Sequence, residues 1–293
     1  MTHAGRFAPS PSGELHVGNL RTAILAWLFA RSTGRRFLLR VEDLDRARAG
    51  AEAVQLRDLA ALGVTWDGPV VRQTDREPLY TAAIARLAAA GLTYECFCTR
   101  REIQEAPSAP HAPLGAYPGT CRSLPAAELE FRRSTRPAAI RLRSSVAEWT
   151  VEDVLHGAYT GMVDDFVLRR NDGVTAYNLA VVVDDAEQGI DQVVRGDDLL
   201  PSTPRQAYLA SLLNMPVPEY AHVPLVINDD GARLAKRDGA VTLGDLAKAG
   251  IAPRAVRRTI LASLGLPGTS LEEALGEFTP AGLPREPWVW ASR

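Results

Sequence analysis

Lysine is nearly absent from this 293-residue sequence, in which Lys236 and Lys248 are the two lysines among 33 basic residues. Cysteine is also scarce: Cys96, Cys98 and Cys121 are the three in the chain. An odd number of cysteines within a short stretch does not indicate a disulfide scaffold. The 33 basic and 35 acidic residues nearly cancel, so the chain is no polycation. A nucleic-acid partner would therefore need a local basic patch.

Long hydrophobic runs are missing as well. The longest apolar run near the start, residues 23–30, is far too short to span a bilayer, and no basic leader precedes it. We therefore expect a cytoplasmic protein with no membrane partner and no secretory signal. The composition, 46% hydrophobic and 23% charged, is typical of globular proteins and excludes disordered and collagen-like chains. The length allows either one large domain or a catalytic domain with one or two small ones.

Apolar periodicity predicts an α/β fold with a parallel sheet. A strand over 4–8, a helix over 19–31 and a buried strand over 37–41 form a βαβ start. Two helices over 50–62 and 77–91 follow, and an insert then interrupts the pattern. Alternation resumes with strands over 165–170, 190–195 and 223–227 and helices over 175–183 and 203–213, and the remaining chain is predicted to be all-helical, over 243–249, 253–264 and 269–276.

Two loops carry patterns that suit phosphate chemistry. The first, residues 9–19, reads Pro-Ser-Pro-Ser-Gly-Glu-Leu-His-Val-Gly-Asn and lies between a strand and a helix. Such a loop presents backbone N–H groups and a helix N-terminus to an anion, Gly18 allows close approach, and His16 can donate to a phosphate oxygen. The second, residues 232–238, reads Ala-Arg-Leu-Ala-Lys-Arg-Asp and contains Lys236, which could stabilise a leaving pyrophosphate. Either loop alone is also compatible with an ordinary surface turn.

Together the two loops resemble the two signatures of class I aminoacyl-tRNA synthetases. The start Arg-Phe-Ala-Pro-Ser-Pro-Ser-Gly at 6–13 is similar to the glutamyl branch, as are the blocks at 39–45 and 194–200. The resemblance covers residues 4–240 and implies a Rossmann-like catalytic domain. Asn19 departs from it, standing where the signature often has a second histidine, and Ala235 stands where the lysine loop often has serine.

The number of residues after the second signature narrows the resemblance to one family. About 55 residues follow the second signature, where glutamyl-tRNA synthetases carry a large helical part that reads the anticodon. The chain is therefore similar to the glutamyl-Q tRNA(Asp) synthetase family, and we expect no anticodon-binding domain. The resemblance implies activation of L-glutamate with ATP in the absence of tRNA. Glutamate would then be esterified onto the queuosine at the wobble position of tRNA(Asp).

Three alternatives remain open. A truncated glutamyl-tRNA synthetase would charge the acceptor end of a tRNA, and a related nucleotidyltransferase would act on a small acid without tRNA. A non-catalytic tRNA-binding paralogue is the third, although the presence of His16 and Lys236 argues against it. We expect a monomer.

Charge complementarity suggests the glutamate site. Glutamate has two carboxylates, which suit the planar guanidinium fork of arginine, and one ammonium. Arg6 leads into the first loop, Arg195 ends a predicted strand and Glu42 follows another, so all three would face the crevice beyond the strand ends. Tyr177 could add a hydroxyl. The resemblance implies that glutamate contacts these four residues and the first-loop segment Phe7, Ala8, Pro9 and Ser10.

The ATP site is expected beside it. The resemblance assigns ATP binding to His16, Gly18, Asn19 and Lys236, with magnesium entering as the ATP complex. His16 and Lys236 are the predicted catalytic residues. His16 would share the charge that develops on the α-phosphate, and Lys236 would accompany pyrophosphate.

The cysteine spacing predicts a structural zinc site with one ion per chain. Two cysteines one residue apart and a third further on can bind zinc tetrahedrally, which leaves one position for another ligand. Chemistry alone favours His111 there, because imidazole is a common zinc ligand. The resemblance implies Tyr117, because the family pattern Cys-x-Cys…Tyr-x-x-x-Cys matches this sequence.

The remaining signals are weaker. Residues 131–143 hold five arginines and no acidic residue, which would suit tRNA phosphates or an ordinary solvated face equally well. His3, His156 and His222 have no partner in the sequence pattern and are assigned no role. The predicted division is a catalytic first half over 1–93, a zinc-binding insert over 94–125, the remainder of the insert and the second catalytic half over 126–240, and a short helical C-terminal region over 241–293.

Overall fold

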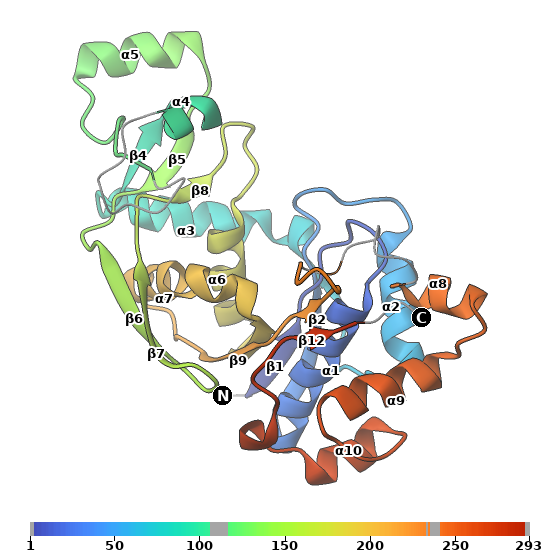
Figure 1. Cartoon of the computed structure of the whole chain (residues 1–293). Coiled ribbons are helices and arrows are strands. Elements are labelled where there is room, and N and C mark those ends of the chain that lie inside the picture. The colour runs from blue at the N-terminus through green and yellow to red at the C-terminus, as the bar shows by residue number, and fades with distance from the viewer. Residues whose placement is uncertain (1–2, 106–116, 233, 235–240, 291–293) are drawn as a thin grey trace.

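The structure is a computed structural model, and it describes residues 3–105, 117–232, 234 and 241–290 (Figure 1). A central seven-stranded sheet has the order β3-β2-β1-β9-β10-β6-β7. All neighbours in it pair in parallel except β6 and β7, which form an antiparallel hairpin. The strands are β1 (Ala4–Phe7), β2 (Arg36–Val41), β3 (Val71–Arg72), β6 (Glu148–Asp153), β7 (Gly157–Met162), β9 (Ile190–Gly196) and β10 (Glu219–Val223).

The strand order creates a switch point at the centre of the sheet. From β1 the chain builds outward through β2 and β3 on one side, and the later strands β9 and β10 continue the sheet on the other side. In open α/β sheets, ligands bind beyond the carboxyl ends of the strands at such a point. The fold therefore places a binding crevice above β1 and β9.

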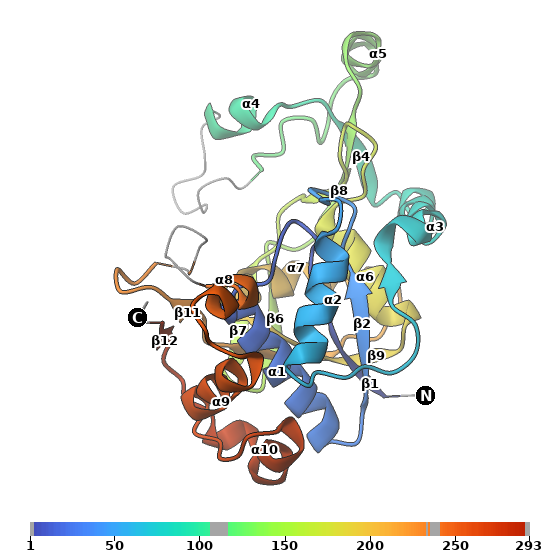
Figure 2. The ribbon, with the colours of Figure 1, turned by 90° about the vertical axis from the view of Figure 1, so that its right-hand side faces the viewer.

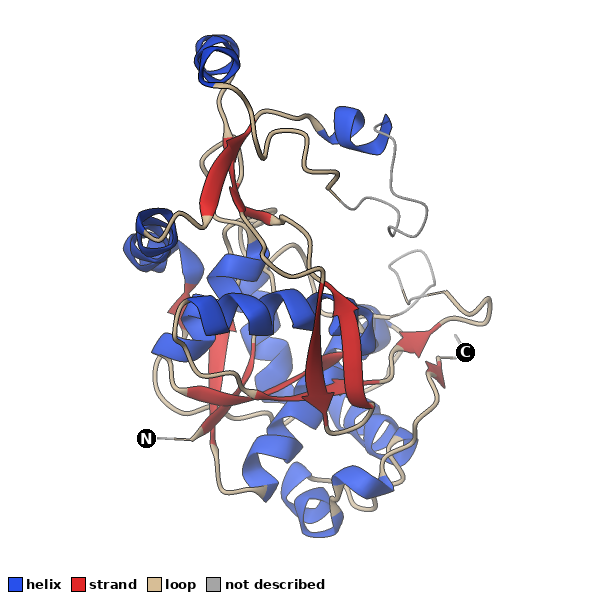
Figure 3. Cartoon of the chain, turned by 90° about the vertical axis from the view of Figure 1, so that its left-hand side faces the viewer, coloured by secondary structure: helices blue, strands red, loops and turns tan. Residues whose placement is uncertain are grey.

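Helices cover both faces of the sheet, which confirms the predicted fold class (Figures 2 and 3). One apolar cluster joins α1 and α2 to the C-terminal helices, and a second joins α3, α6 and α7. Helix α1 is buried along most of its length because it is enclosed between the sheet and the C-terminal helices. The bounds are α1 (Val17–Ser32), α2 (Ala51–Ala61), α3 (Glu77–Ala89), α6 (Tyr177–Glu187) and α7 (Thr203–Leu212), with 3₁₀ turns η1 (Gln73–Arg76) and η2 (Asp197–Ser202).

A second, small antiparallel sheet projects from this body (Figure 1). It has the order β4-β5-β8 and carries the helices α4 and α5 at its outer end. The strand expected over 165–170 exists, but it pairs with β5 rather than extending the parallel sheet. Its apolar pattern predicts a strand and contains no information about which sheet the strand joins. The elements are β4 (Thr93–Cys96), α4 (Arg100–Glu105), α5 (Ala126–Thr135), β5 (Ala139–Leu142) and β8 (Val167–Arg169).

The three C-terminal helices form where the sequence predicts them, but the expectation of an all-helical end is wrong. Strand β12 (Trp288–Val289) pairs in parallel with β11 (Val226–Ile227). Two residues are too few to show a periodic pattern, so this pairing depends on tertiary contacts. The helices share one core with α1, in which the rings of Phe29 and Phe278 lie 5.2 Å apart. They are α8 (Leu243–Lys248), α9 (Pro253–Ser263) and α10 (Leu271–Glu277), followed by η4 (Pro280–Gly282).

Within the described residues, no helix combines the length and apolar character that crossing a bilayer requires.

Candidate active site

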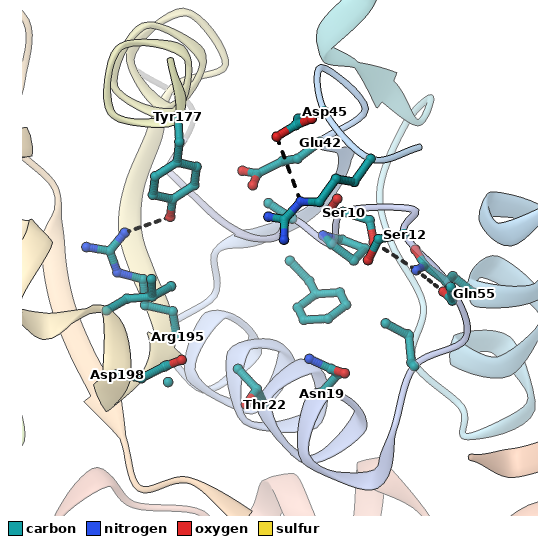
Figure 4. A pocket seen from close by; sticks show the side chains of 18 of the residues that line it. Ser10, Ser12, Asn19, Thr22, Glu42, Asp45, Gln55, Tyr177, Arg195 and Asp198 are labelled. Carbon is teal, nitrogen blue, oxygen red and sulfur yellow. Dashed lines mark hydrogen bonds and ion pairs between the residues drawn. The ribbon is translucent and has the colours of Figure 1, made fainter. Parts of the chain in front are cut away.

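A cavity of about 870 Å³ opens at the carboxyl ends of β1, β2 and β9. Its walls come from the loop after β1, the first turn of α1, the segment after β2 and the start of α6 (Figure 4). Lys236 lies outside the described residues. Every other residue predicted to bind glutamate or ATP lines this one cavity: Arg6, Phe7, Ala8, Pro9, Ser10, His16, Gly18, Asn19, Glu42, Tyr177 and Arg195.

The loop after β1 is held in place by α2. The Gln55 side-chain amide donates to the carbonyl oxygens of Ser10 (3.0 Å) and Gly13 (2.6 Å) (Figure 4). The backbone N–H of Glu42 donates to the carbonyl of Pro9 at 2.9 Å, which ties the loop to the end of β2. The Pro/Ser/Gly loop is therefore a preorganised wall of the cavity. Its sequence predicts a turn but does not reveal the role of Gln55.

His16 is the N-cap of α1 and shares a capping box with Asn19. The His16 N–H donates to Asn19 Oδ1 at 3.2 Å, and the Asn19 N–H donates to His16 Nδ1 at 3.3 Å. Because Nδ1 accepts, a neutral imidazole carries its proton on Nε2. A Cβ at Gly18 would lie 2.9 Å from Cε1 of His16, so glycine is required for this packing. The first loop thus presents a histidine of defined tautomer at a helix N-terminus.

The residues that flank the lysine loop are held by the start of α1 on one side and by β11 on the other. The Val17 N–H donates to the carbonyl of Val241 at 2.8 Å, and His16 forms an isolated β-bridge with Thr242. On the other side of the loop, the Leu234 N–H donates to the carbonyl of Val226, which lines the cavity. Described residues on both sides of Lys236 therefore lie near the first loop, although more than 200 residues separate the two sequence signatures.

Arg6 and Glu42 belong to a buried charge network. Asp185 accepts from Nε of Arg6 at 3.2 Å and from Nη1 of Arg40 at 2.8 Å, and Arg40 also pairs with Glu42 at 3.4 Å. Burial would raise the pKa of Asp185, but Arg6 and Arg40 hold it below its ordinary value. Burial raises the pKa of Glu42, and Arg40 and Arg6 oppose that shift. Asp185 thus stays ionised and fixes Arg6, while burial makes the charged form of Glu42 costly even with Arg40 beside it.

Arg195 lines the same cavity from β9, the strand beside β1. Its Nη1 donates to Tyr177 Oη at 3.3 Å (Figure 4), its Nη2 donates to Thr203 Oγ1 at 2.8 Å, and its Nε donates to His222 Nε2 at 3.0 Å. His222 in turn contacts Asp153, with Nδ1 2.6 Å from Oδ2. Sequence reasoning assigned His222 no role and did not find Asp153 or Thr203. The sequence contains no local signal for these contacts.

A charged pair lies at the rim of the cavity. Arg170, from the segment after β8, contacts Asp45, from the segment after β2, at 3.1 Å. Both side chains are about half exposed. The pair joins the segment after β2 to the segment after β8 beside the cavity.

The three cysteines gather near the end of β4, whose last residue is Cys96. Their Sγ atoms lie within 4.8 Å of one another, and the three thiols form no disulfide. Tyr117 Oη lies 3.3 Å from Cys96 Sγ and 3.7 Å from Cys98 Sγ. Three soft thiolates with a fourth oxygen donor form a set that could hold a metal ion of the zinc type. His111 lies outside the described residues.

The arginines of residues 131–143 divide into two groups. On and after α5 they form ion pairs, namely Arg132 with Glu128, Arg133 with Glu95, and Arg136 with Glu102. Arg141 and Arg143, on and after β5, lie over the rings of Tyr117 and Tyr94. These contacts make the cluster part of the internal support of the small sheet.

Comparisons with known proteins agree with this geometry. The family model of class I tRNA synthetases (E and Q), catalytic domain, matches residues 4–279. The chain is 68% identical to a glutamyl-Q tRNA(Asp) synthetase of Nocardia farcinica, over 98% of this chain and 92% of the relative. A protein of the same name from Cutibacterium acnes is 55% identical, over 90% of this chain and 76% of the relative.

Solved structures point the same way. A glutamate tRNA ligase from Elizabethkingia meningosepticum, crystallised with its amino acid, superposes with a TM-score of 0.84 at 28% identity. The match covers 99% of this chain and 67% of that ligase. An arginyl tRNA synthetase structure from Campylobacter jejuni, at 15% identity and a TM-score of 0.51, shares the fold alone.

Proposed function

This chain belongs to the class I tRNA synthetases of the E and Q type, and on that basis we propose that it activates glutamate with ATP without tRNA and then transfers glutamate to queuosine in tRNA(Asp). It is a ligase of the aminoacyl-tRNA synthetase type, with glutamyl-Q tRNA(Asp) synthetases among its relatives. One observation carries the proposal: two arginines and a carboxylate face the same cavity as a capped histidine at a helix N-terminus.

Glutamate is bound by charge complementarity. Arg6 and Arg195 come from the neighbouring strands β1 and β9, and each offers guanidinium N–H groups to a carboxylate of the substrate. Glu42 receives the ammonium, which would add a positive charge beside a carboxylate whose ionised form is penalised by burial. Tyr177, already in contact with Arg195, adds a hydroxyl. The backbone of residues 7–10 closes the site from the β1 side.

ATP is bound at the start of α1. Gly18 and Asn19 are the second and third residues of that helix, where the positive end of the helix dipole favours an anion. A glutamate carboxylate oxygen attacks the α-phosphorus, the bond to the bridging oxygen breaks, and pyrophosphate leaves. His16 donates from Nε2 to the phosphate as charge develops, and Lys236 accompanies pyrophosphate. Magnesium arrives as the ATP complex and neutralises phosphate charge.

Transfer completes the reaction. A hydroxyl oxygen of the queuosine cyclopentenediol attacks the carbonyl carbon of glutamyl-adenylate. An ester forms, and AMP leaves with the phosphate oxygen. The rim between Asp45 and Arg170 is the opening through which the modified base would enter. Positioning accounts for most of the rate in such a step, because both reactants are held in one cavity.

Zinc has a structural role in this proposal. Cys96, Cys98 and Cys121 supply thiolates and Tyr117 the fourth ligand, which its hydroxyl distances support. None of these four residues lines the cavity, and the cluster joins β4 to the segment before α5. Zinc would hold the insert of residues 94–125 together. The first catalytic half, 1–93, precedes this insert, the remainder of the insert and the second catalytic half follow over 126–240, and 241–293 is the C-terminal region.

The test is exchange of radiolabelled pyrophosphate into ATP. With glutamate and no tRNA, we expect exchange that glutamine and aspartate do not support. A glutamyl-tRNA synthetase that needs tRNA for activation would show exchange only after tRNA is added. A paralogue without catalytic activity would show none under either condition, and that result would reject the proposal.

A further inference from the structure

Behind Arg195, the side chains of His222 and Asp153 form a hydrogen-bonded series that leads away from the cavity. Arg195 on β9 and His222 on β10 are register partners in the parallel sheet, so their side chains emerge from the same face. His222 lies between Arg195 and Asp153, the last residue of β6. Three adjacent strands thus each contribute one member. All three residues are buried, and the side chains of Asp153 and His222 are fully so.

We propose that Asp153 and His222 are positioning residues that fix the guanidinium of Arg195 for carboxylate recognition. This inference rests on the proposed function, in which Arg195 binds glutamate. Neither residue reaches the cavity lining, so both act through Arg195 and not on the substrate.

Asp153 sets the direction of each hydrogen bond in the series Asp153–His222–Arg195. Asp153 Oδ1 accepts backbone N–H groups from Leu155 (2.9 Å) and His156 (3.1 Å), which anchors the carboxylate. Its Oδ2 then accepts from Nδ1 of His222, so the imidazole proton is on Nδ1. That leaves the lone pair of Nε2 to accept from Nε of Arg195. The opposite tautomer would bring two N–H groups face to face.

The charges around His222 favour this neutral form. Burial lowers its pKa, Arg195 lowers it further, and Asp153 opposes both. His156 approaches the His222 carbonyl from the β6–β7 connection at 3.0 Å, and Tyr220 of β10 stacks against the ring. A cationic His222 would repel Arg195, whereas the neutral ring accepts from it.

These contacts restrict the orientation of the Arg195 guanidinium. It has five N–H donors, and His222, Thr203 and Tyr177 each take one. One N–H remains on each terminal nitrogen, the number that a bidentate contact with a carboxylate requires. A guanidinium held in this way favours two acceptor oxygens over the amide of glutamine, which offers one.

Two substitutions of His222 separate its contacts. In His222→Gln the amide oxygen takes the place of Nε2 and can accept from Arg195, whereas in His222→Asn the shorter amide can contact only Asp153. We expect His222→Asn to raise the KM for glutamate by about tenfold or more and to reduce discrimination against glutamine. His222→Gln should stay within about threefold of the parent, and the KM for ATP should change in neither variant.

A substitution of Asp153 tests whether this residue sets the hydrogen-bond directions from His222 to Arg195. In Asp153→Asn, Oδ1 can keep its backbone contacts while an amide N–H group faces Nδ1, which forces the wrong tautomer on His222. The KM for glutamate should rise by about tenfold. In the double variant Asp153→Asn/His222→Gln that increase should disappear, because a glutamine side chain has no tautomer to relay. Asp191→Asn, on the far end of β9, is the control: it should lower the melting temperature alone.

The outcomes of these experiments distinguish failure of the positioning role from failure of the proposed function. If the parent shows no glutamate-dependent exchange, the proposed function fails. If the parent is active, either of two results would overturn the positioning role of Asp153 and His222. The first is an equal rise in the KM for glutamate when Asp153→Asn is made in the parent and in the His222→Gln background. The second is equal behaviour of His222→Asn and His222→Gln. Should Asp153→Asn not fold, the comparison of the two His222 variants decides alone.

Discussion

His16 and Asn19 cap the first turn of α1 reciprocally, each accepting the other's backbone N–H at 3.2–3.3 Å. The mutual cap joins the proposed catalytic imidazole to the helix whose N-terminus receives the phosphates. Asn19 stands where the family signature often has a second histidine, and the structure gives it this capping role. The orientation of His16 therefore depends on the packing of one short turn.

Gly18→Ala should disturb that turn specifically. A Cβ there would lie 2.9 Å from Cε1 and 3.0 Å from Nδ1 of His16, so the ring must move. We expect kcat for pyrophosphate exchange to fall by roughly a hundredfold, as when one donor to a developing oxyanion is lost. The KM for glutamate should change little. In Gly276→Ala, a new Cβ on α10 meets nothing within 4 Å, so equal losses in both variants would contradict this role for His16.

Arg195→Lys tests the shape of the cation and not its charge. Lysine keeps the positive charge but loses the planar fork and the contacts with His222 and Thr203. The KM for glutamate should rise by about a hundredfold, while the KM for ATP stays constant. The matched control is Arg35→Lys, at an ion pair with Asp191 distant from the cavity lining. A KM for glutamate unchanged in Arg195→Lys would remove Arg195 from the site.

Glutamate binding should weaken on acidification through Glu42. Burial raises the pKa of this carboxyl above the ordinary value of about 4.3, so it takes up a proton at a higher pH than a free side chain does. The ammonium of glutamate needs the ionised form. The KM for glutamate should therefore rise as pH falls through the raised pKa, by up to about tenfold per unit below it. Glu42→Gln should raise the KM at neutral pH and flatten this profile. A profile identical to that of the parent would exclude Glu42 as the ammonium partner.

Removal of zinc should affect stability more than activation. In Cys98→Ser the cluster loses one thiolate, so we expect bound zinc to fall well below one ion per chain and the melting temperature to decrease. Exchange of pyrophosphate should continue at temperatures where the variant is folded. Tyr117→Phe removes the hydroxyl near Cys96 and Cys98 and should weaken zinc binding less. Metal analysis that finds no zinc in the parent protein would contradict this site.

Periodicity predicted the elements of the fold better than their pairing. The βαβ start and the helices on both faces each contain a complete local pattern, so their existence and type could be predicted. The β6–β7 hairpin was missed, although Trp149 and Val151 alternate with polar residues. The sheet that β8 joins and the pairing of β12 with β11 depend on tertiary contacts. No local pattern contains that information.

The site residues divide in the same way, into those that a local motif predicts and those that only tertiary contacts bring together. Residues within a contiguous motif, such as His16 and Gly18, could be found because the loop is read as one unit. His222 could not, since its partners Arg195 and Asp153 are 27 and 69 positions away. Asp185, which fixes Arg6, is 179 positions from it. Supporting residues of this kind come from different elements, and folding alone brings them together. Lys236, although predicted, lies outside the described residues.

The acceptor is tested most directly by transfer of radiolabelled glutamate to two preparations of tRNA(Asp), one with queuosine at the wobble position and one with unmodified guanosine there. The account predicts an alkali-labile glutamyl ester on the first preparation and none on the second, with removal of the terminal adenosine of the acceptor end leaving transfer intact. Equal charging of both preparations, abolished when that adenosine is removed, would contradict it.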